Sequence, residues 1–176
     1  MEVQRVDRPH YLMDQQAVQS SAGVRLDVCQ PAKAGPVLTQ EAPWESFYLH
    51  PHSLVQHDGE YLLYYTVYLV GEGPARVATC LATSTDGLCW ERPALGQVEY
   101  AGGRANNLLA VGGTVTIDPA APAERRFLMT GSAAVPPPGT QGAVVDGVAL
   151  YTSPDGRRWT PASSVLSPFT CDTNNQ

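Results

Sequence analysis

The same seven-residue motif occurs twice in the chain, and this repeat constrains the fold more than any other feature. Residues 84–90 read Ser-Thr-Asp-Gly-Leu-Cys-Trp and residues 153–159 read Ser-Pro-Asp-Gly-Arg-Arg-Trp. The Asp residues and the Trp residues are each 69 positions apart (155 − 86 and 159 − 90). Asp-Gly is a strong hairpin signal because glycine adopts positive φ without steric cost and aspartate can hydrogen-bond its own backbone. Since runs typical of strands precede both copies, at 76–83 and 148–152, each motif is predicted to join two antiparallel strands, and the fold class is predicted to be all-β.

The repeat extends upstream of the corners. Residues 58–65 have a counterpart at 124–129, and the strand-like residues 55–57 match 114–117. Each copy therefore follows one order: strand, turn, long strand, strand, Asp-Gly corner, short strand. Tandem units of about four antiparallel strands are the signature of β-propeller blades. We expect two four-stranded sheets, at roughly 50–95 and 112–162, packed face to face and free of any helix longer than two turns.

A closed propeller needs roughly four to eight blades, and only two complete copies fit into 176 residues. The expectation is therefore an N-terminal fragment of a longer propeller. Residues 1–41 would be an N-terminal extension and linker, 42–103 the first blade and 104–170 the second. Residues 171–176 would begin a third blade, since the Asn-Asn pair at 106–107 recurs at 174–175.

Composition excludes several classes of partner. The formal net charge is −6, from 11 Lys and Arg against 17 Asp and Glu, whereas nucleic-acid binding needs clustered basic residues. No stretch approaches the ~20 apolar residues of a membrane span, and the N-terminus has no apolar core like that of a signal peptide. The sequence thus predicts no nucleic-acid or membrane partner and, by default, a cytoplasmic protein.

The cysteines and histidines predict no metal site and no cofactor. Four cysteines, at 29, 80, 89 and 171, lack the paired spacing of zinc ligands. Cys80 and Cys89 flank the first corner and could face each other across strands, but two buried free thiols are the favoured interpretation. His50 and His52 flank a proline, which makes a poor chelate.

A candidate site follows from the propeller hypothesis. The innermost strand of each blade lines a central channel, and ligands bind at the mouth of that channel, where these strands begin. The polar residues in equivalent positions of successive copies are Glu45, Asn106, Asn107, Asp172 and Asn174. Glycoside cleavage needs carboxylates on opposite sides of a sugar, so Glu45 and Asp172 are the candidate catalytic residues. The candidate substrate-binding residues are Trp44, Tyr48, Asn106, Asn107 and Asn174, the aromatic rings among them packing on the C–H surface of a sugar.

A structural interpretation of the same residues stays open. Trp44 and Tyr48 could fill the interface between blades, and Glu45 could hold a loop in place. Asp86 and Asp155 are assigned a structural role, because both lie in the repeated corner, on the outer rim of a blade.

The succession of motifs also resembles a known family. These motifs are Pro43-Trp44-Glu45, Asp58-Gly59-Glu60-Tyr61, the corners at 84–93 and 153–159, Leu95-Gly96, Asn106-Asn107, 122–127 and 172–175. Over about residues 10–176 the chain resembles the N-terminal part of five-bladed propeller proteins related to family 43 and family 32 glycoside hydrolases. It is most similar to the bacterial group labelled as family 32-like glycosyl hydrolases. The resemblance implies three carboxylates from different blades; Asp172 is similar to a channel aspartate, and Glu45 stands where the first blade offers its carboxylate.

Two functions are therefore expected. The first is hydrolysis of O-glycosidic bonds by paired carboxylates without a cofactor, in which case the fragment alone would be inactive. The wide separation expected between Glu45 and Asp172 would then suit an inverting mechanism, whose carboxyl groups lie roughly 6.5–9.5 Å apart. The second is a non-catalytic propeller that binds carbohydrate or a partner. A glutamate at the start of a later blade would favour the enzyme.

Overall fold

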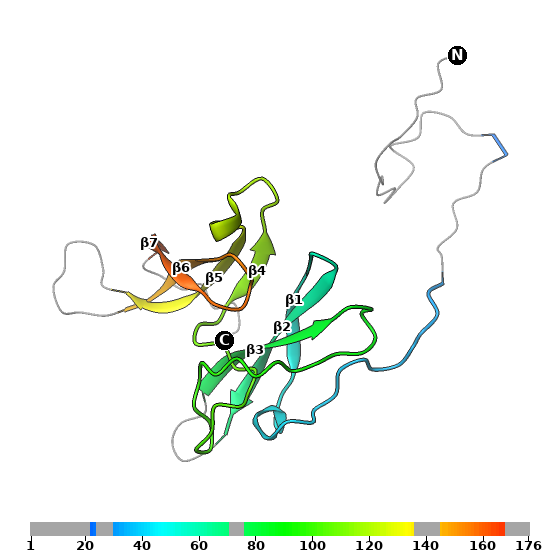
Figure 1. Cartoon of the computed structure of the whole chain (residues 1–176), viewed down its shortest axis with the longest axis horizontal. Helices are drawn as coiled ribbons and strands as arrows, with labels where there is room; N and C mark the ends of the chain where they lie inside the picture. The colour runs from blue at the N-terminus through cyan, green and yellow to red at the C-terminus, as the bar shows by residue number, and fades with distance from the viewer. Residues whose placement is uncertain (1–21, 24–29, 71–75, 136–144, 168–176) are drawn as a thin grey trace. The chain divides into compact units, whose positions relative to one another are not determined.

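The computed structural model describes residues 22–23, 30–70, 76–135 and 145–167 (Figure 1). The chain divides into two compact units, Met1–Ala34 and Gly35–Gln176. The described residues of the first unit contain no helix or strand.

The first sheet of the second unit is antiparallel, in the order β1-β2-β3. Its strands are β1 (His50–His57), β2 (Glu60–Leu69) and β3 (Arg76–Ser84). The turn between β1 and β2 contains Asp58 and Gly59, with φ values of 49° and 80°. Two successive positive φ values define the tight hairpin turn that matches the twist of the strands. The turn predicted at Asp58-Gly59 is thus confirmed, and it fixes the register that pairs His57 with Glu60.

The second sheet is also antiparallel, in the order β4-β5-β6-β7. It contains β4 (Thr114–Ile117), β5 (Phe127–Val135), β6 (Val145–Ser153) and β7 (Thr160–Ser167), with the 3₁₀ turn η3 (Ala123–Arg125) before β5. The two sheets fall within the segments predicted as first and second blade. Each sheet has its first strand at one edge, and β1 lies beside β4 (Figure 1).

The two Asp-Gly corners are built from the same hydrogen bonds. In the first corner, Ser84 Oγ accepts from the amides of Asp86 and Gly87, and Asp86 Oδ1 accepts from the amides two and three residues further on. Every one of these bonds recurs at the matching position of residues 153–158. The tryptophans differ, since Trp90 Nε1 donates to Gly87 O while Trp159 Nε1 has no partner among the described residues. The repeat read from the sequence is therefore a repeat of backbone geometry.

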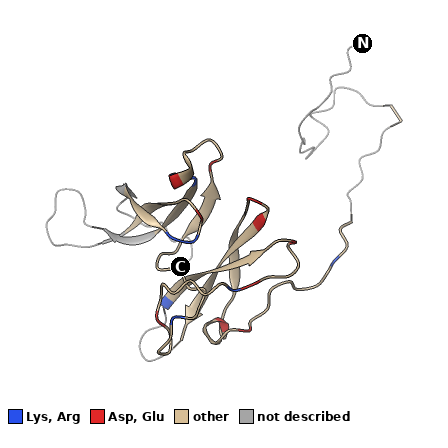
Figure 2. Cartoon of the chain, viewed as in Figure 1, with Lys and Arg blue, Asp and Glu red and all other residues tan. Residues whose placement is uncertain are grey.

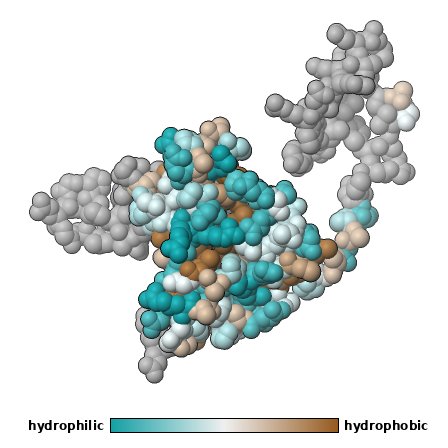
Figure 3. All heavy atoms as spheres, viewed as in Figure 1, coloured by the Kyte–Doolittle hydropathy of each residue, from teal (hydrophilic) through white to brown (hydrophobic). Residues whose placement is uncertain are grey.

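A shared hydrophobic core joins the two sheets. Its buried members from the first sheet are Val55, Leu62, Tyr64 and Leu81; those from the second sheet and from the segment before it are Leu109, Val115, Phe127 and Met129. Charged residues lie in loops and near strand ends (Figure 2). On the face drawn in Figure 3, apolar residues gather in small areas between larger polar ones. The two sheets thus bury apolar side chains against each other, as expected.

The second corner also docks onto the first sheet. Tyr64 Oη donates to Gly156 O at 2.8 Å, and Arg157 Nη2 lies 2.6 Å from Glu60 Oε2. Gln97 Nε2 donates to Arg157 O at 2.8 Å. The corner is therefore a joint between the two sheets as well as a turn.

The expectation of a fourth strand in the first sheet is wrong. After the first corner, the chain pairs with β3 at two isolated bridges, Thr83 with Glu91 and Cys80 with Leu108, and neither extends into a strand. Pro93 follows two residues after Glu91, and proline has no N–H group with which to extend a strand. The first sheet accordingly has three strands.

No α-helix occurs among the described residues, whose only helical elements are 3₁₀ turns. In the part of the chain that the structure describes, no helix is long and apolar enough to cross a membrane. Cys80 and Cys89 are free thiols, as favoured, but Cys89 is exposed. The expectation that both are buried is wrong for Cys89, because it belongs to a corner whose hydrogen bonds use its backbone amide and leave its side chain toward solvent.

Candidate functional site

The candidate residue Glu45 ends the 3₁₀ turn η2 (Pro43–Glu45) and is fully buried. Tyr65 Oη donates to Glu45 Oε1 at 2.6 Å. Arg92 donates twice to the carboxylate, from Nε at 2.8 Å and from Nη2 at 3.0 Å. The backbone amides of Glu41 and Ala42 each donate to Oε2 at 3.0 Å. The carboxylate is thus saturated with donors from its own turn, β2 and the segment after the first corner.

This environment keeps Glu45 ionised. Burial by itself would raise the pKa of Glu45, but hydrogen bonds from Arg92, from Tyr65 and from the backbone outweigh it and hold that pKa below its ordinary value. A general acid in glycoside cleavage needs the opposite shift. In the described chain, the carboxylate of Glu45 therefore serves as an anchor for residues 41–45.

Three sequence-predicted site residues do come together, through Tyr65. Trp44 Nε1 donates to Asn107 Oδ1 at 2.8 Å, and Asn107 Nδ2 donates to Tyr65 Oη at 2.6 Å and to Leu81 O at 2.8 Å. Tyr65 in turn bonds Glu45. Trp44 packs against the core on this face of the first sheet. This arrangement corresponds to the structural interpretation of Trp44 and Glu45.

The remaining candidates lie elsewhere. Asn106 donates to Val98 O at 2.8 Å and is buried. Asn107 O accepts from Leu81 N at 3.0 Å, so the Asn-Asn pair runs along the outer edge of β3, whereas β4 begins only at Thr114. Tyr48 is at the surface beside β1. Asp172 and Asn174 lie outside the described residues, and a catalytic pair of Glu45 with Asp172 stays a prediction.

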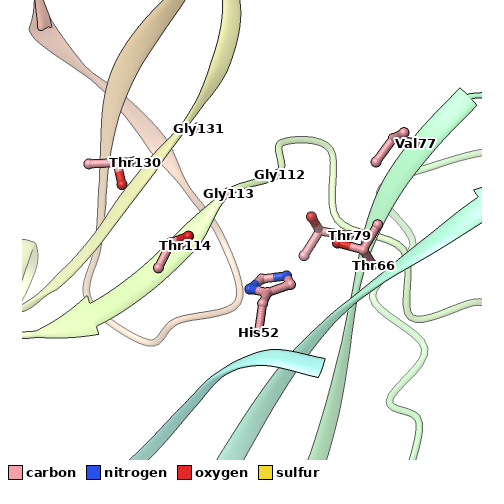
Figure 4. Close-up of a pocket in the computed structure, with 9 residues that line it drawn as sticks. All are labelled: His52, Thr66, Val77, Thr79, Gly112, Gly113, Thr114, Thr130 and Gly131. Atoms are coloured by element: carbon pink, nitrogen blue, oxygen red, sulfur yellow. The ribbon is translucent and has the colours of Figure 1, made fainter. Parts of the chain in front are cut away.

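A hollow lies where β1 and β4 begin. It has a volume of about 550 Å³. The nine residues lining it are His52, Thr66, Val77, Thr79, Gly112, Gly113, Thr114, Thr130 and Gly131 (Figure 4). None of them carries a permanent charge, and four supply hydroxyl groups. We call this hollow the threonine pocket.

A β-bulge aims His52 into the threonine pocket. Pro51 pairs with Tyr65 and Ser53 pairs with Tyr64, so His52 is an extra residue in β1 without a partner in β2. A bulge of this kind re-aims side chains, because the alternation of the strand is interrupted by one residue. His52 and the core-facing Ser53 therefore lie toward the same side, and Figure 4 shows the ring between the first sheet and the start of β4. The sequence carries no residue pattern that signals this bulge.

Hydrogen bonds favour one tautomer of the His52 ring. Ser53 Oγ accepts from Val115 N at 2.9 Å and lies 3.0 Å from His52 Nδ1, to which its own hydroxyl proton can be donated. This chain of bonds favours the tautomer that carries a proton on Nε2. Burial, together with the neighbouring His50, lowers the pKa of His52, so the ring is neutral near pH 7 and can donate from Nε2.

Glycine backbone forms the wall of the pocket opposite β1. A methyl group on Gly131 would overlap Gly112 O, and one on Gly112 would lie 2.5 Å from Thr79 Oγ1. The absence of side chains lets the loop before β4 pack directly on β5 and exposes peptide groups to the pocket. Among the described residues, no three His, Cys, Asp or Glu side chains are grouped so that they could hold a metal ion.

The threonine pocket thus combines one neutral imidazole, four hydroxyl groups and bare peptide groups at the position where the propeller hypothesis expects a ligand. No protein-family model matches the chain, and no curated protein matches its sequence.

Proposed function

We propose that the two sheets are part of a propeller-type domain that binds carbohydrate, with the threonine pocket as the recognition site. The observation that carries this proposal is the bulge that turns the neutral His52 ring toward four threonine residues. Threonine hydroxyls both donate and accept hydrogen bonds, and the neutral His52 imidazole adds a donor at Nε2, since its Nδ1 is bonded to Ser53. Such a set of groups matches the alternating donors and acceptors of sugar hydroxyls.

The chemistry of the pocket argues for a neutral ligand. A phosphate or carboxylate group would call for Lys, Arg or a helix N-terminus, and the lining residues offer none of these. A volume of about 550 Å³ is within the usual range for small-molecule sites. A hydroxyl-rich ligand is the class that this lining accommodates best.

A titration of the isotope-labelled protein with neutral monosaccharides, followed by NMR, tests the proposal. Thr114→Val should weaken binding by about fivefold, since one lost hydrogen bond is worth about 1 kcal/mol. Thr116→Val is the matched control, because Thr116 is another exposed threonine of β4 outside the pocket lining. Absence of chemical-shift changes at the pocket with every sugar, or equal affinities of both variants and the parent protein, would refute the proposal.

Hydrolysis of O-glycosidic bonds within a five-bladed propeller is the second candidate. The tandem repeat supports it, together with the adjacency of β1 and β4, the strands expected to line a channel. Release of nitrophenol from aryl glycosides by a complete five-bladed propeller that contains this chain, and its loss when that propeller carries Asp172→Asn, is the expected result. Undiminished hydrolysis by the Asp172→Asn propeller would show that Asp172 is not catalytic and would leave carbohydrate binding as the function proposed for the pocket.

A further inference from the structure

Four rings gather at the surface where β1 begins and β2 ends. Tyr48 stacks on His50, with ring centroids 5.7 Å apart, and meets Tyr68 edge to face at 5.1 Å. Phe47 meets the same Tyr68 edge to face at 6.1 Å. We call Phe47, Tyr48, His50 and Tyr68 the aromatic platform.

The aromatic platform remains open to solvent. Phe47 is 70% exposed and Tyr48 is 37% exposed. A groove of about 480 Å³ runs beside them, lined also by the polar side chains of Thr39 and Gln40. Large apolar side chains that gather at the surface mark binding sites more often than isolated ones do.

The platform continues the threonine pocket along the same face of the first sheet. In the ladders of this sheet, His50 pairs with Thr66, and Tyr68 pairs with Val77. Thr66 and Val77 both line the pocket. Directly opposed residues of neighbouring strands have Cβ atoms about 5 Å apart on one face, a distance comparable to the length of one sugar unit. A ligand chain that leaves the pocket in this direction would therefore pass over the rings.

We propose that the aromatic platform binds the further units of a neutral oligosaccharide whose terminal unit occupies the threonine pocket. This inference rests on the proposed function. Aromatic faces pack on the C–H surfaces of sugar rings, and the groove beside Phe47 and Tyr48 adds polar groups from Thr39 and Gln40 for the hydroxyls. No Lys, Arg, Asp or Glu lines either the pocket or the groove, so both parts of the site suit the same uncharged chain.

Calorimetric titration of the whole chain with cello-, xylo- and malto-oligosaccharides, from the monosaccharide upward, tests the inference. The parent protein should bind one series more tightly as the chain lengthens. Phe47→Ala and Tyr48→Ala should each lose about three- to tenfold in affinity for the longer sugars and leave monosaccharide affinity unchanged. Tyr48→Phe, which keeps the aromatic ring, should retain the increase in affinity with the length of the sugar chain. Leu54→Ala is the control, because Leu54 is an exposed apolar residue of β1 outside the platform.

The possible outcomes separate the two proposals. If monosaccharides bind at the pocket but affinity does not rise with the length of the sugar chain, the proposal for the aromatic platform is wrong and the proposed function stands. No binding of any sugar would overturn both. Concentration-dependent dimerisation that Phe47→Ala abolishes in analytical ultracentrifugation, without a change in sugar affinity, would identify the platform as a contact between two copies of the chain instead.

Discussion

Cys80 and Cys89 lie close together in the sequence but differ in their surroundings. Cys80 is fully buried, and burial, with the nearby Glu45 carboxylate adding to it, raises the pKa of its thiol to about 12. Cys89 is exposed. Because the thiolate is the reactive form, iodoacetamide at pH 8 should label Cys89 and leave Cys80 unmodified in the folded protein. Peptide mass spectrometry checks this, with urea-unfolded protein as the control in which both react. Equal labelling of both cysteines in the folded state would contradict the burial of Cys80.

The anchor at Glu45 should be a large source of stability. Glu45→Gln removes the charge that neutralises Arg92, and breaking a buried ion pair from one side costs about 3–5 kcal/mol. Glu41→Gln is the matched control: Glu41 also bonds Arg92, at 3.1 Å, but is largely exposed, and exposed pairs contribute at most about 1 kcal/mol. Urea unfolding of both variants measures the difference. Similar decreases in the free energy of unfolding of the two variants would show that burial of Glu45 does not strengthen its ion pair with Arg92.

The same carboxylate makes stability depend on pH. The pKa of Glu45 is lower in the folded chain than its ordinary value, which is the value expected when unfolded. Glu45 thus contributes stability that is fully present above the unfolded pKa and is lost as the pH falls through the folded one. The difference in unfolding free energy between the parent protein and Glu45→Gln should shrink as the pH is lowered into this window. A difference independent of pH would contradict an ionised Glu45.

At the scale of elements, the repeated corner supplies a matched pair of glycines. Gly87 and Gly156 both have positive φ, 73° and 69°, so alanine strains the backbone at either position. At Gly156 the added methyl group would also lie 2.5 Å from Tyr64 Oη, whereas at Gly87 its nearest neighbour, on Tyr61, is 4.0 Å away. Gly156→Ala should therefore destabilise the protein by about 1–3 kcal/mol more than Gly87→Ala, as measured by thermal unfolding. Equal losses of stability in the two variants would show that the second corner does not act as a joint between the sheets.

Strand positions could be predicted from the sequence because they depend on local patterns. The β4 residues 114–117 were recognised by their β-forming composition, and the Asp58-Gly59 turn by residue types that tolerate positive φ. Contacts between distant residues had no such signal. Glu45 and Arg92 are 47 positions apart, and nothing in either local sequence indicates that they pair. The threonine pocket was missed for the same reason, since its lining comes from five strands and one loop.

At the scale of the whole molecule, the shared core predicts that the two sheets unfold together. Leu62 comes from the first sheet and Met129 from the second, and both are buried in the same cluster. Leu62→Ala and Met129→Ala should each cost about 2–5 kcal/mol. Trp159 packs on this cluster, whereas Trp44 and Trp90 pack on the opposite face of the first sheet. Fluorescence of Trp159→Phe and of the double variant Trp44→Phe/Trp90→Phe should report one common transition, shifted equally by either core substitution. Separate transitions would mean that each sheet folds by itself.

Because of the bulge in β1, the presence of a histidine in the threonine pocket depends on the number of residues in β1 as well as on the residue types. Loss of a single codon, the one for Pro51, would let His52 take the place opposite Tyr65 that Pro51 now holds. The Tyr65 side chain belongs to the core on the other face of the sheet, so the imidazole would change sides while every pocket threonine stayed in the sequence. A one-residue deletion could thus abolish sugar binding in a descendant of this chain, and a one-residue insertion could have created the binding site in an ancestor. Titration of the Pro51 deletion variant with sugars would show this as a loss of affinity, because His52 would no longer face the pocket.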